Sequence, residues 1–105
     1  MRHSISGLFL VCGIFAGTSI PANANDVEVG QTLYKKECRA CHGPTAKGLA
    51  SYPKLVGQSA EYLVDKLTRY KAGEKFGPNT PLMAPRAKKL SEEDIANISA
   101  FIASL

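Results

Sequence analysis

Residues 38–42 read Cys38-Arg39-Ala40-Cys41-His42, and the interpretation of the whole chain depends on this short stretch. Side chains three residues apart on a helical turn share one face, so the two thiols project together. An imidazole follows directly after the second thiol. This combination can form a disulfide, ligate a metal or attach a prosthetic group covalently.

The pattern C-x-x-C-H is the attachment motif of a c-type haem. Both thiols can reach the two vinyl groups on one porphyrin edge, and His42 then offers its imidazole to the iron. A thioredoxin-type motif would need a βαβ scaffold, and tetrahedral zinc needs four ligands where this stretch offers three. A structural disulfide would leave the adjacent His42 without a role. The sequence therefore predicts one haem c, covalently bound through Cys38 and Cys41, with His42 as an iron ligand.

The composition is that of one small domain whose core needs an additional stabilising element. The chain has 105 residues, a formal charge of +4, no Trp, four Phe and four Tyr. This length excludes large multi-step enzymes, repeat arrays and polytopic membrane proteins. Small domains poor in large aromatic residues depend on a disulfide, a metal or a cofactor. We expect the haem to supply the missing apolar surface, so the apoprotein should be molten or unfolded.

The N-terminal residues 1–24 have the features of a signal peptide. Basic Arg2 precedes an uncharged, mostly apolar run over residues 5–20, and Ala22-Asn23-Ala24 has the small-x-small pattern of a cleavage site. The run is short of the roughly 20 residues that span a bilayer. We expect cleavage after about Ala24, a periplasmic domain over residues 25–105 and no stable membrane insertion. The alternatives are an uncleaved anchor and a lipoprotein through Cys12.

The fold class is predicted to be all-α, because three segments have helical periodicity and none alternates as a strand does. The first helix runs from about Asp26 to Cys38, with Val29, Leu33 and Tyr34 on one side. The second begins after Ser59 as N-cap and ends before Gly73. Its apolar residues are Tyr62, Leu63, Leu67 and Tyr70.

The third helix begins at a capping box of Ser91 and Asp94, and Leu90 with Ile95 can form a hydrophobic staple around it. Its apolar face is formed by Ile95, Ile98, Phe101, Ile102 and Leu105. The connections over residues 43–58 and 73–90 are rich in Gly and Pro and are predicted to be irregular. Long loops in a small domain are usually functional, so we expect both to wrap the cofactor.

Met83 is the expected sixth ligand of the iron. It is the only methionine after Ala24, and Pro81 and Pro85 on either side stiffen a backbone that we expect to be non-helical. A buried core methionine is the ordinary alternative. A thioether bound to a His-ligated iron raises its reduction potential and closes the site to water and gases.

The chain resembles the class I bacterial monohaem cytochromes c of the small, soluble, periplasmic type with His/Met ligation, over essentially all of residues 26–105. The resemblance rests on Gly30, Tyr34, Cys38-x-x-Cys41-His42-Gly43, Pro53-Lys54-Leu55-Val56-Gly57-Gln58, Glu61-Tyr62-Leu63, Tyr70-Lys71-x-Gly73, Met83, Asp94-Ile95-Ala96 and Phe101-Ile102. It identifies residues 25–105 as a class I cytochrome c domain, with three main helices and long loops around a covalent haem.

The resemblance also implies two specific contacts. Gly30 should let the first helix cross closely against the last one, near Phe101. The carbonyl of Pro53 should accept a hydrogen bond from the second nitrogen of His42, which would set the tautomer and basicity of the imidazole.

The function expected from these residues is one-electron transfer without chemical change of a substrate, so the protein is not expected to be an enzyme. The alternatives are an electron-delivering subunit of a larger oxidoreductase complex and a gas-binding or peroxidase-like protein with an open distal site. A haem-free thiol oxidoreductase is a further alternative.

The partners are expected to be redox proteins with an acidic docking surface. Some of the basic residues that flank the motif or Met83 should ring the exposed haem edge and steer such a partner. These residues are Arg39, Lys47, Lys54, Arg86, Lys88 and Lys89. An exported, weakly basic domain is a poor fit for nucleic acid. A monomer or weak dimer is expected.

Overall fold

The computed structural model describes Gly13, Gly17 and residues 26–105. The predicted signal peptide and its cleavage site at Ala24 therefore lie outside the described residues, apart from those two glycines. The helices are α1 (Val27–Glu37), α2 (Arg39–His42), α3 (Ala60–Lys71), α4 (Thr80–Lys88) and α5 (Glu92–Ala103). Over residues 26–105 there is no strand beyond an isolated bridge between Leu49 and Tyr52. The all-α prediction is confirmed.

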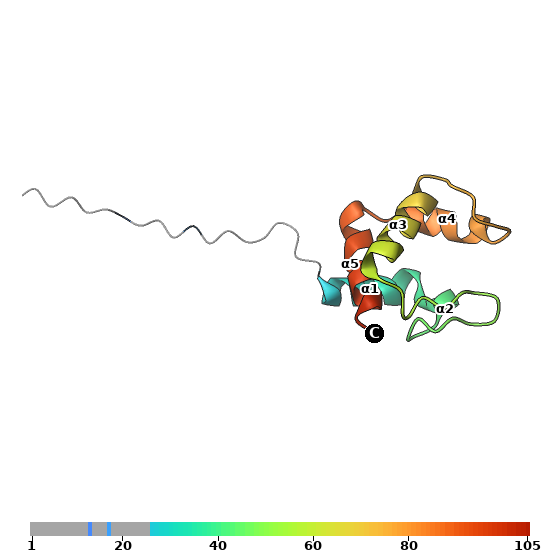
Figure 1. Ribbon diagram of the computed structural model, residues 1–105, viewed down its shortest axis with the longest axis horizontal. Coiled ribbons are helices and arrows are strands. Elements are labelled where there is room, and N and C mark those ends of the chain that lie inside the picture. The colour runs from blue at the N-terminus through green and yellow to red at the C-terminus, as the bar shows by residue number, and fades with distance from the viewer. Residues whose placement is uncertain (1–12, 14–16, 18–25) are drawn as a thin grey trace, which may run out of the picture.

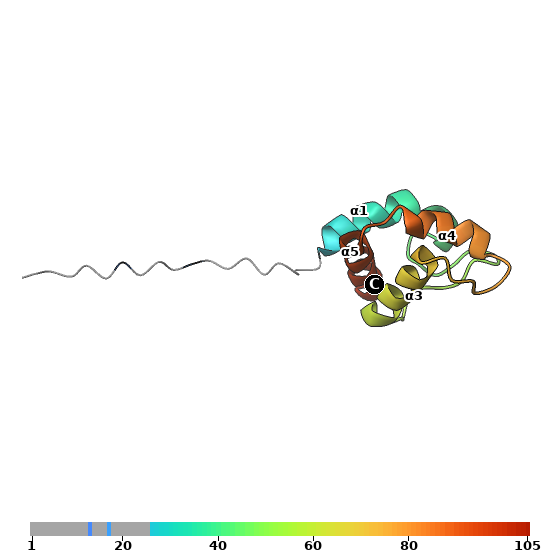
Figure 2. The same cartoon turned by 90° about the horizontal axis from the view of Figure 1, so that it is seen from above.

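Helices α1 and α5 cross, and α3 packs against both α5 and α4 (Figure 1). The segment after α2 and helix α4 extend to the same side of the molecule, away from that crossing (Figure 2). Among the described residues, none of these helices has the length and apolar character needed to cross a membrane.

Gly30 allows the close crossing of α1 and α5. A Cβ atom added there would lie 2.0 Å from the carbonyl oxygen of Asn97 and 3.0 Å from Cβ of Phe101. The Asn97 side chain also accepts a hydrogen bond of 2.9 Å from the backbone N–H of Asp26. The contact expected near Phe101 is therefore present, and only glycine leaves room for it.

The predicted helix starts at Ser59 and Ser91 are confirmed. The Ser59 hydroxyl accepts from the N–H of Tyr62, and Ser91 and Asp94 form the reciprocal capping box. Leu90 and Ile95, the expected staple, are both buried in one core cluster. That core also contains Tyr34, Cys38, Ala46, Leu63, Leu67, Ile98, Phe101 and Ile102.

Three residues assigned to apolar helix faces are instead exposed. Val29 lies on α1, Tyr62 lies on α3, and Leu105 follows the end of α5. Spacing alone placed them on these faces, but α1 and α3 each bury a narrow stripe against α5. Leu105 lies beyond the last helical turn, where no neighbouring element covers it.

The prediction that residues 73–90 are irregular throughout is wrong, because α4 occupies Thr80–Lys88. Pro81 lies in the first turn, where a missing N–H costs no helical hydrogen bond. Pro85 lies inside the helix and leaves the carbonyl of Pro81 without its usual donor. Burial of Thr80 and Ala87 and the packing of α4 against α3 offset this local cost, and Met83 therefore lies on a helix.

Candidate functional site

A cavity of about 260 Å³ lies between α4 and the region where α1 meets α2, and residues of α3 and α5 complete its wall. Its wall contains both thiols of the motif, the imidazole and the thioether: Cys38, Cys41, His42 and Met83. Most of the remaining wall is apolar and includes Leu55, Leu63, Leu67, Leu82, Ala87, Leu90, Ile98 and Ile102. The sequence-predicted ligands are thus brought together in one apolar cavity.

The two thiols lie on the single turn that the motif predicts. The backbone N–H groups of Cys41 and His42 both donate to the carbonyl of Cys38, at 3.2 Å and 3.0 Å. Cys38 is buried, Cys41 is partly exposed, and both are free. Burial raises the pKa of the Cys38 thiol to about 11. A thiol that stays protonated at neutral pH is unlike the low-pKa cysteine of a thiol oxidoreductase.

His42 is buried and held from its Nδ1 side. Nδ1 lies 2.9 Å from the carbonyl oxygen of Pro53, which can only accept, so Nδ1 carries the proton and donates it. The lone pair is then left on Nε2, the nitrogen free to bind a metal. The carbonyl of His42 itself accepts from the N–H of Gly48 at 2.8 Å. The loop after the motif thus holds both the ring and the backbone of His42.

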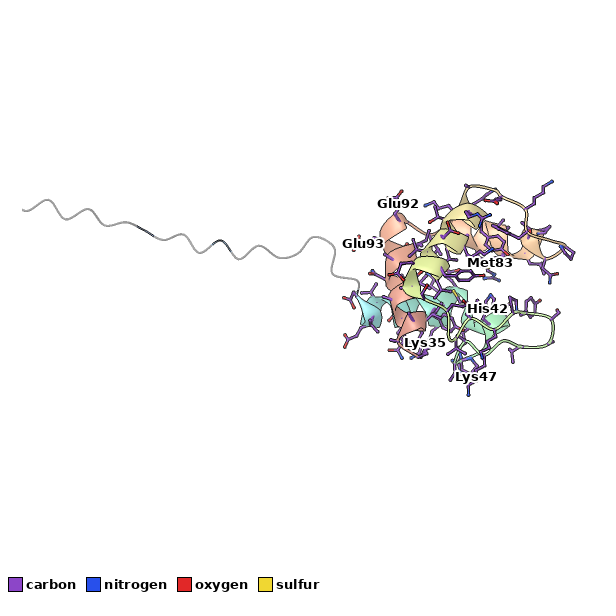
Figure 3. All side chains as sticks on the ribbon, viewed as in Figure 1. Lys35, His42, Lys47, Met83, Glu92 and Glu93 are labelled. Carbon is purple, nitrogen blue, oxygen red and sulfur yellow. The ribbon has the colours of Figure 1, made fainter. Side chains whose placement is uncertain are left out.

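Met83 lies on α4, on the opposite side of the cavity from His42 on α2 (Figure 3). It belongs to the inner face of α4. The cavity-lining residues of this helix and of its two flanks recur at helical spacing: Asn79, Leu82, Met83, Arg86, Ala87 and Leu90. This periodicity is visible in the sequence and indicates the helix, although Pro81 and Pro85 argue against it.

The donor set fits a c-type haem better than the alternatives. Over residues 26–105 there is no group of three or more His, Cys, Asp or Glu side chains placed to hold a metal ion, so donors for tetrahedral zinc are not assembled there. Two free thiols, an imidazole and a thioether on an apolar wall are the groups that hold a porphyrin covalently at one edge and its iron on two faces.

Of the basic residues expected around the haem edge, Lys54 and Arg86 line the cavity, whereas Arg39, Lys47, Lys88 and Lys89 do not. Lys66 lines it as well and was missed by the sequence interpretation. Its ammonium lies 4.3 Å from the ring centre of Phe76 and 5.7 Å from that of Tyr62. Helical spacing in the sequence could have placed Lys66 at the cavity, since it follows Tyr62 by four residues and Leu63 by three.

The family model described as Cytochrome c matches residues 27–105 of this chain. The chain belongs to the cytochrome c family. Members of this family carry a covalently bound c-type haem with iron and transfer electrons, and in this cytochrome c the attachment cysteines are Cys38 and Cys41.

Relatives of similar size support the same family. The chain is 40% identical over 90 residues to cytochrome c-554(547) of Halothiobacillus neapolitanus, and the match covers 78% of this chain and 99% of that protein. It is 50% identical over 68 residues to cytochrome c-554(548) of Halomonas halodenitrificans, covering 64% of this chain and 82% of that protein. The resemblance to a small monohaem-type cytochrome c is therefore confirmed.

Two larger proteins match this chain over part of their own length. A solved structure of cytochrome c4 from Acidithiobacillus ferrooxidans superposes with a TM-score of 0.66 at 23% identity, covering 80% of this chain and 53% of that one. A relative named thiosulfate dehydrogenase electron acceptor, from Stutzerimonas stutzeri, is 36% identical over 70 residues, or 66% of this chain and 32% of that protein.

Proposed function

We propose that this cytochrome c is a periplasmic one-electron carrier whose haem iron is bound axially by His42 and Met83, and that it is not an enzyme. The observation that carries the proposal is that the only imidazole and the only thioether of residues 26–105 line the same apolar cavity from opposite sides. The periplasmic location rests on the predicted signal peptide.

When bound, the haem supplies an iron that alternates between Fe(III) and Fe(II). The chain contributes ligands and their orientation. The Pro53 carbonyl holds Nδ1 of His42 and thereby keeps Nε2 directed away from that loop and available for coordination. A thioether from Met83 would close the opposite position and favour the reduced state.

The cavity wall favours electron transfer over acid–base catalysis. Its only carboxylate is Glu37, and that group is paired with Arg86 at 3.9 Å. His42 is held through Nδ1 by the Pro53 carbonyl, and its Nε2 would be used by the iron. The cavity wall therefore offers no unpaired carboxylate as a general base, and its apolar character limits reorganisation of water when the charge changes.

The mouth of the cavity offers a surface for an acidic redox partner. Tyr62 and Leu82 line the cavity and are 45% and 56% exposed, and Lys54 and Lys66 line the same cavity. Exposed apolar groups flanked by lysines fit a partner with a small apolar contact and a carboxylate rim. We propose that the protein docks through this surface as a monomer or weak dimer.

Absorption spectra of the holoprotein in both oxidation states, made in a host with haem maturation, test the ligation. A low-spin spectrum with a weak far-red sulfur-to-iron band is expected, and reduced protein should bind carbon monoxide poorly. Met83→Ala should abolish the band and admit carbon monoxide. Leu82→Ala is the matched control on the same helix and should keep the band. A high-spin or carbon-monoxide-reactive wild type would move the function to ligand binding.

Docking is tested with the anionic oxidant hexacyanoferrate(III), which accepts one electron from the reduced protein. Lys54→Gln and Lys66→Gln should each slow this reaction at low salt and have little effect at high salt. Lys88→Gln, which removes the same charge away from the cavity, should match the wild type. Equal slowing by all three would indicate a net-charge effect and no specific surface.

A further inference from the structure

We propose that Glu37 and Arg86 form an electrostatic clasp across the cavity, which holds α4 against the α1–α2 end of the chain and keeps Met83 in its ligand position. This inference deepens the proposed function and rests on its His/Met ligation. Both are positioning residues in this proposal, since they act on the iron only through Met83.

The two partners stand next to the ligands on the two walls of the cavity. Glu37 ends α1 and directly precedes Cys38, while Arg86 lies three residues after Met83 on the inner face of α4. Nη1 of Arg86 lies 3.9 Å from Oε2 of Glu37. Within residues 26–105 this is the only ion pair or side-chain hydrogen bond found between α4 and the segment that carries the attachment motif.

Helix α4 is otherwise attached on the far side of the cavity. It packs against α3, and the ammonium of Lys71 on α3 donates to the carbonyl of Leu90, just after α4 ends. At its start, the Thr80 hydroxyl accepts from the N–H groups of Phe76 and Gly77, at 2.9 Å and 3.1 Å. Without the clasp, no ion pair or side-chain hydrogen bond within residues 26–105 would connect α4 to the segment that carries His42.

The exposure of the pair makes it more than an ordinary surface contact. The side chain of Glu37 is only 15% exposed, whereas that of Arg86 is 45% exposed. A carboxylate largely removed from water gains more from its partner than an exposed one does, and it loses more when the partner is removed. Movement of α4 away from α1 would separate the two charges and lose their attraction, so the pair opposes opening.

Imidazole binding to the ferric holoprotein measures this opening, because imidazole can bind the iron only when Met83 has left it. The apparent affinity then scales with the fraction of open molecules. Arg86→Gln and Glu37→Gln should each raise it roughly two- to fivefold, the range for one partly exposed ion pair. The double variant should show no more than either single one, because both remove the same contact.

Salt gives a second readout that a purely structural role would not change. Raising the ionic strength to about 1 M, where the Debye length is about 3 Å, should increase the affinity of the wild type for neutral imidazole. The imidazole affinity of Arg86→Gln should not change with salt. Arg86→Lys should have an imidazole affinity between those of the wild type and Arg86→Gln, and it should regain part of the salt response. Lys88→Gln, on the outer side of the same helix, is the control and should behave as the wild type.

The outcomes separate the two proposals. A wild type without the far-red band would overturn the His/Met ligation, and the clasp with it. A wild type that has the band, with Arg86→Gln and Glu37→Gln binding imidazole no more tightly than Lys88→Gln, would overturn the clasp alone.

Discussion

The hydroxyl of Tyr34 on α1 donates a hydrogen bond of 2.6 Å to the carbonyl oxygen of Gly43, the residue after His42. Tyr34 is 1% exposed, and its ring packs against Phe101 of α5 with centroids 5.5 Å apart. One side chain thus connects the crossing of α1 and α5 to the backbone that carries the imidazole. Through this contact, the crossing of α1 and α5 helps to set the position of His42.

Tyr34→Phe should lower the free energy of unfolding of the holoprotein by about 0.5–1.5 kcal/mol. It removes the hydroxyl donor of the buried Gly43 carbonyl, which then keeps only the longer 3.3 Å bond from the N–H of Ala46. The ring and its packing against Phe101 are retained, so the effect isolates the hydroxyl. Chemical denaturation followed by circular dichroism measures it. Tyr62→Phe is the control, because this exposed tyrosine makes no side-chain hydrogen bond within residues 26–105. Equal effects of the two changes would contradict a special role for Tyr34.

The same hydroxyl predicts a loss of stability in alkali. Burial raises the pKa of Tyr34 to about 12 in the folded protein, against about 10 in an unfolded chain. The stabilisation of the fold by the protonated Tyr34 hydroxyl is therefore complete below pH 10. It is lost as the pH rises through about 12, by an amount on the order of 2–3 kcal/mol. Unfolding free energies between pH 8 and pH 12 should fall more steeply for the wild type than for Tyr34→Phe. Parallel curves would contradict the raised pKa.

Gly30→Ala should destabilise the protein by about 1–3 kcal/mol or more, the cost of overpacking a well-filled contact. The new methyl group would meet the backbone of Asn97 at 2.0 Å, and a backbone carbonyl cannot rotate away as a side chain can. Thermal unfolding of the holoprotein measures the loss. Val29→Ala, at the adjacent exposed position, should stay within about 0.5 kcal/mol of the wild type.

Removal of the cofactor should unfold most of the domain. The cavity wall is apolar and is built by residues from α3, α4 and α5 together, so exposing it to water removes a large share of the buried apolar surface. Cys38→Ala/Cys41→Ala, which cannot attach a haem, should give a weak helical signal in circular dichroism and no cooperative melt. A native-like melt of this variant would show that the chain folds without its cofactor.

Much of this site was predictable because it is encoded locally. Cys38, Cys41 and His42 lie within one turn, and Ser59, Ser91 and Asp94 cap their helices through contacts only three residues apart. The partners of Gly30 and Pro53 were implied only by resemblance, since each lies across the fold from the residue that it contacts. The prediction of an irregular segment around Met83 was wrong. Pro81 and Pro85 indicate only the local free-energy cost of a helix, whereas the packing of α4 against α3 is a tertiary contact that this cost does not include.

The sequence by its local pattern determined the all-α class, the chemistry of attachment and the identity of both candidate iron ligands, because helical turns, caps and the scarcity of donors are properties of neighbouring residues. The tertiary structure alone decided which lysines reach the cavity mouth and that Glu37 meets Arg86. These contacts join residues far apart in the chain, and they depend on how α3 and α4 pack, which no short-range pattern specifies.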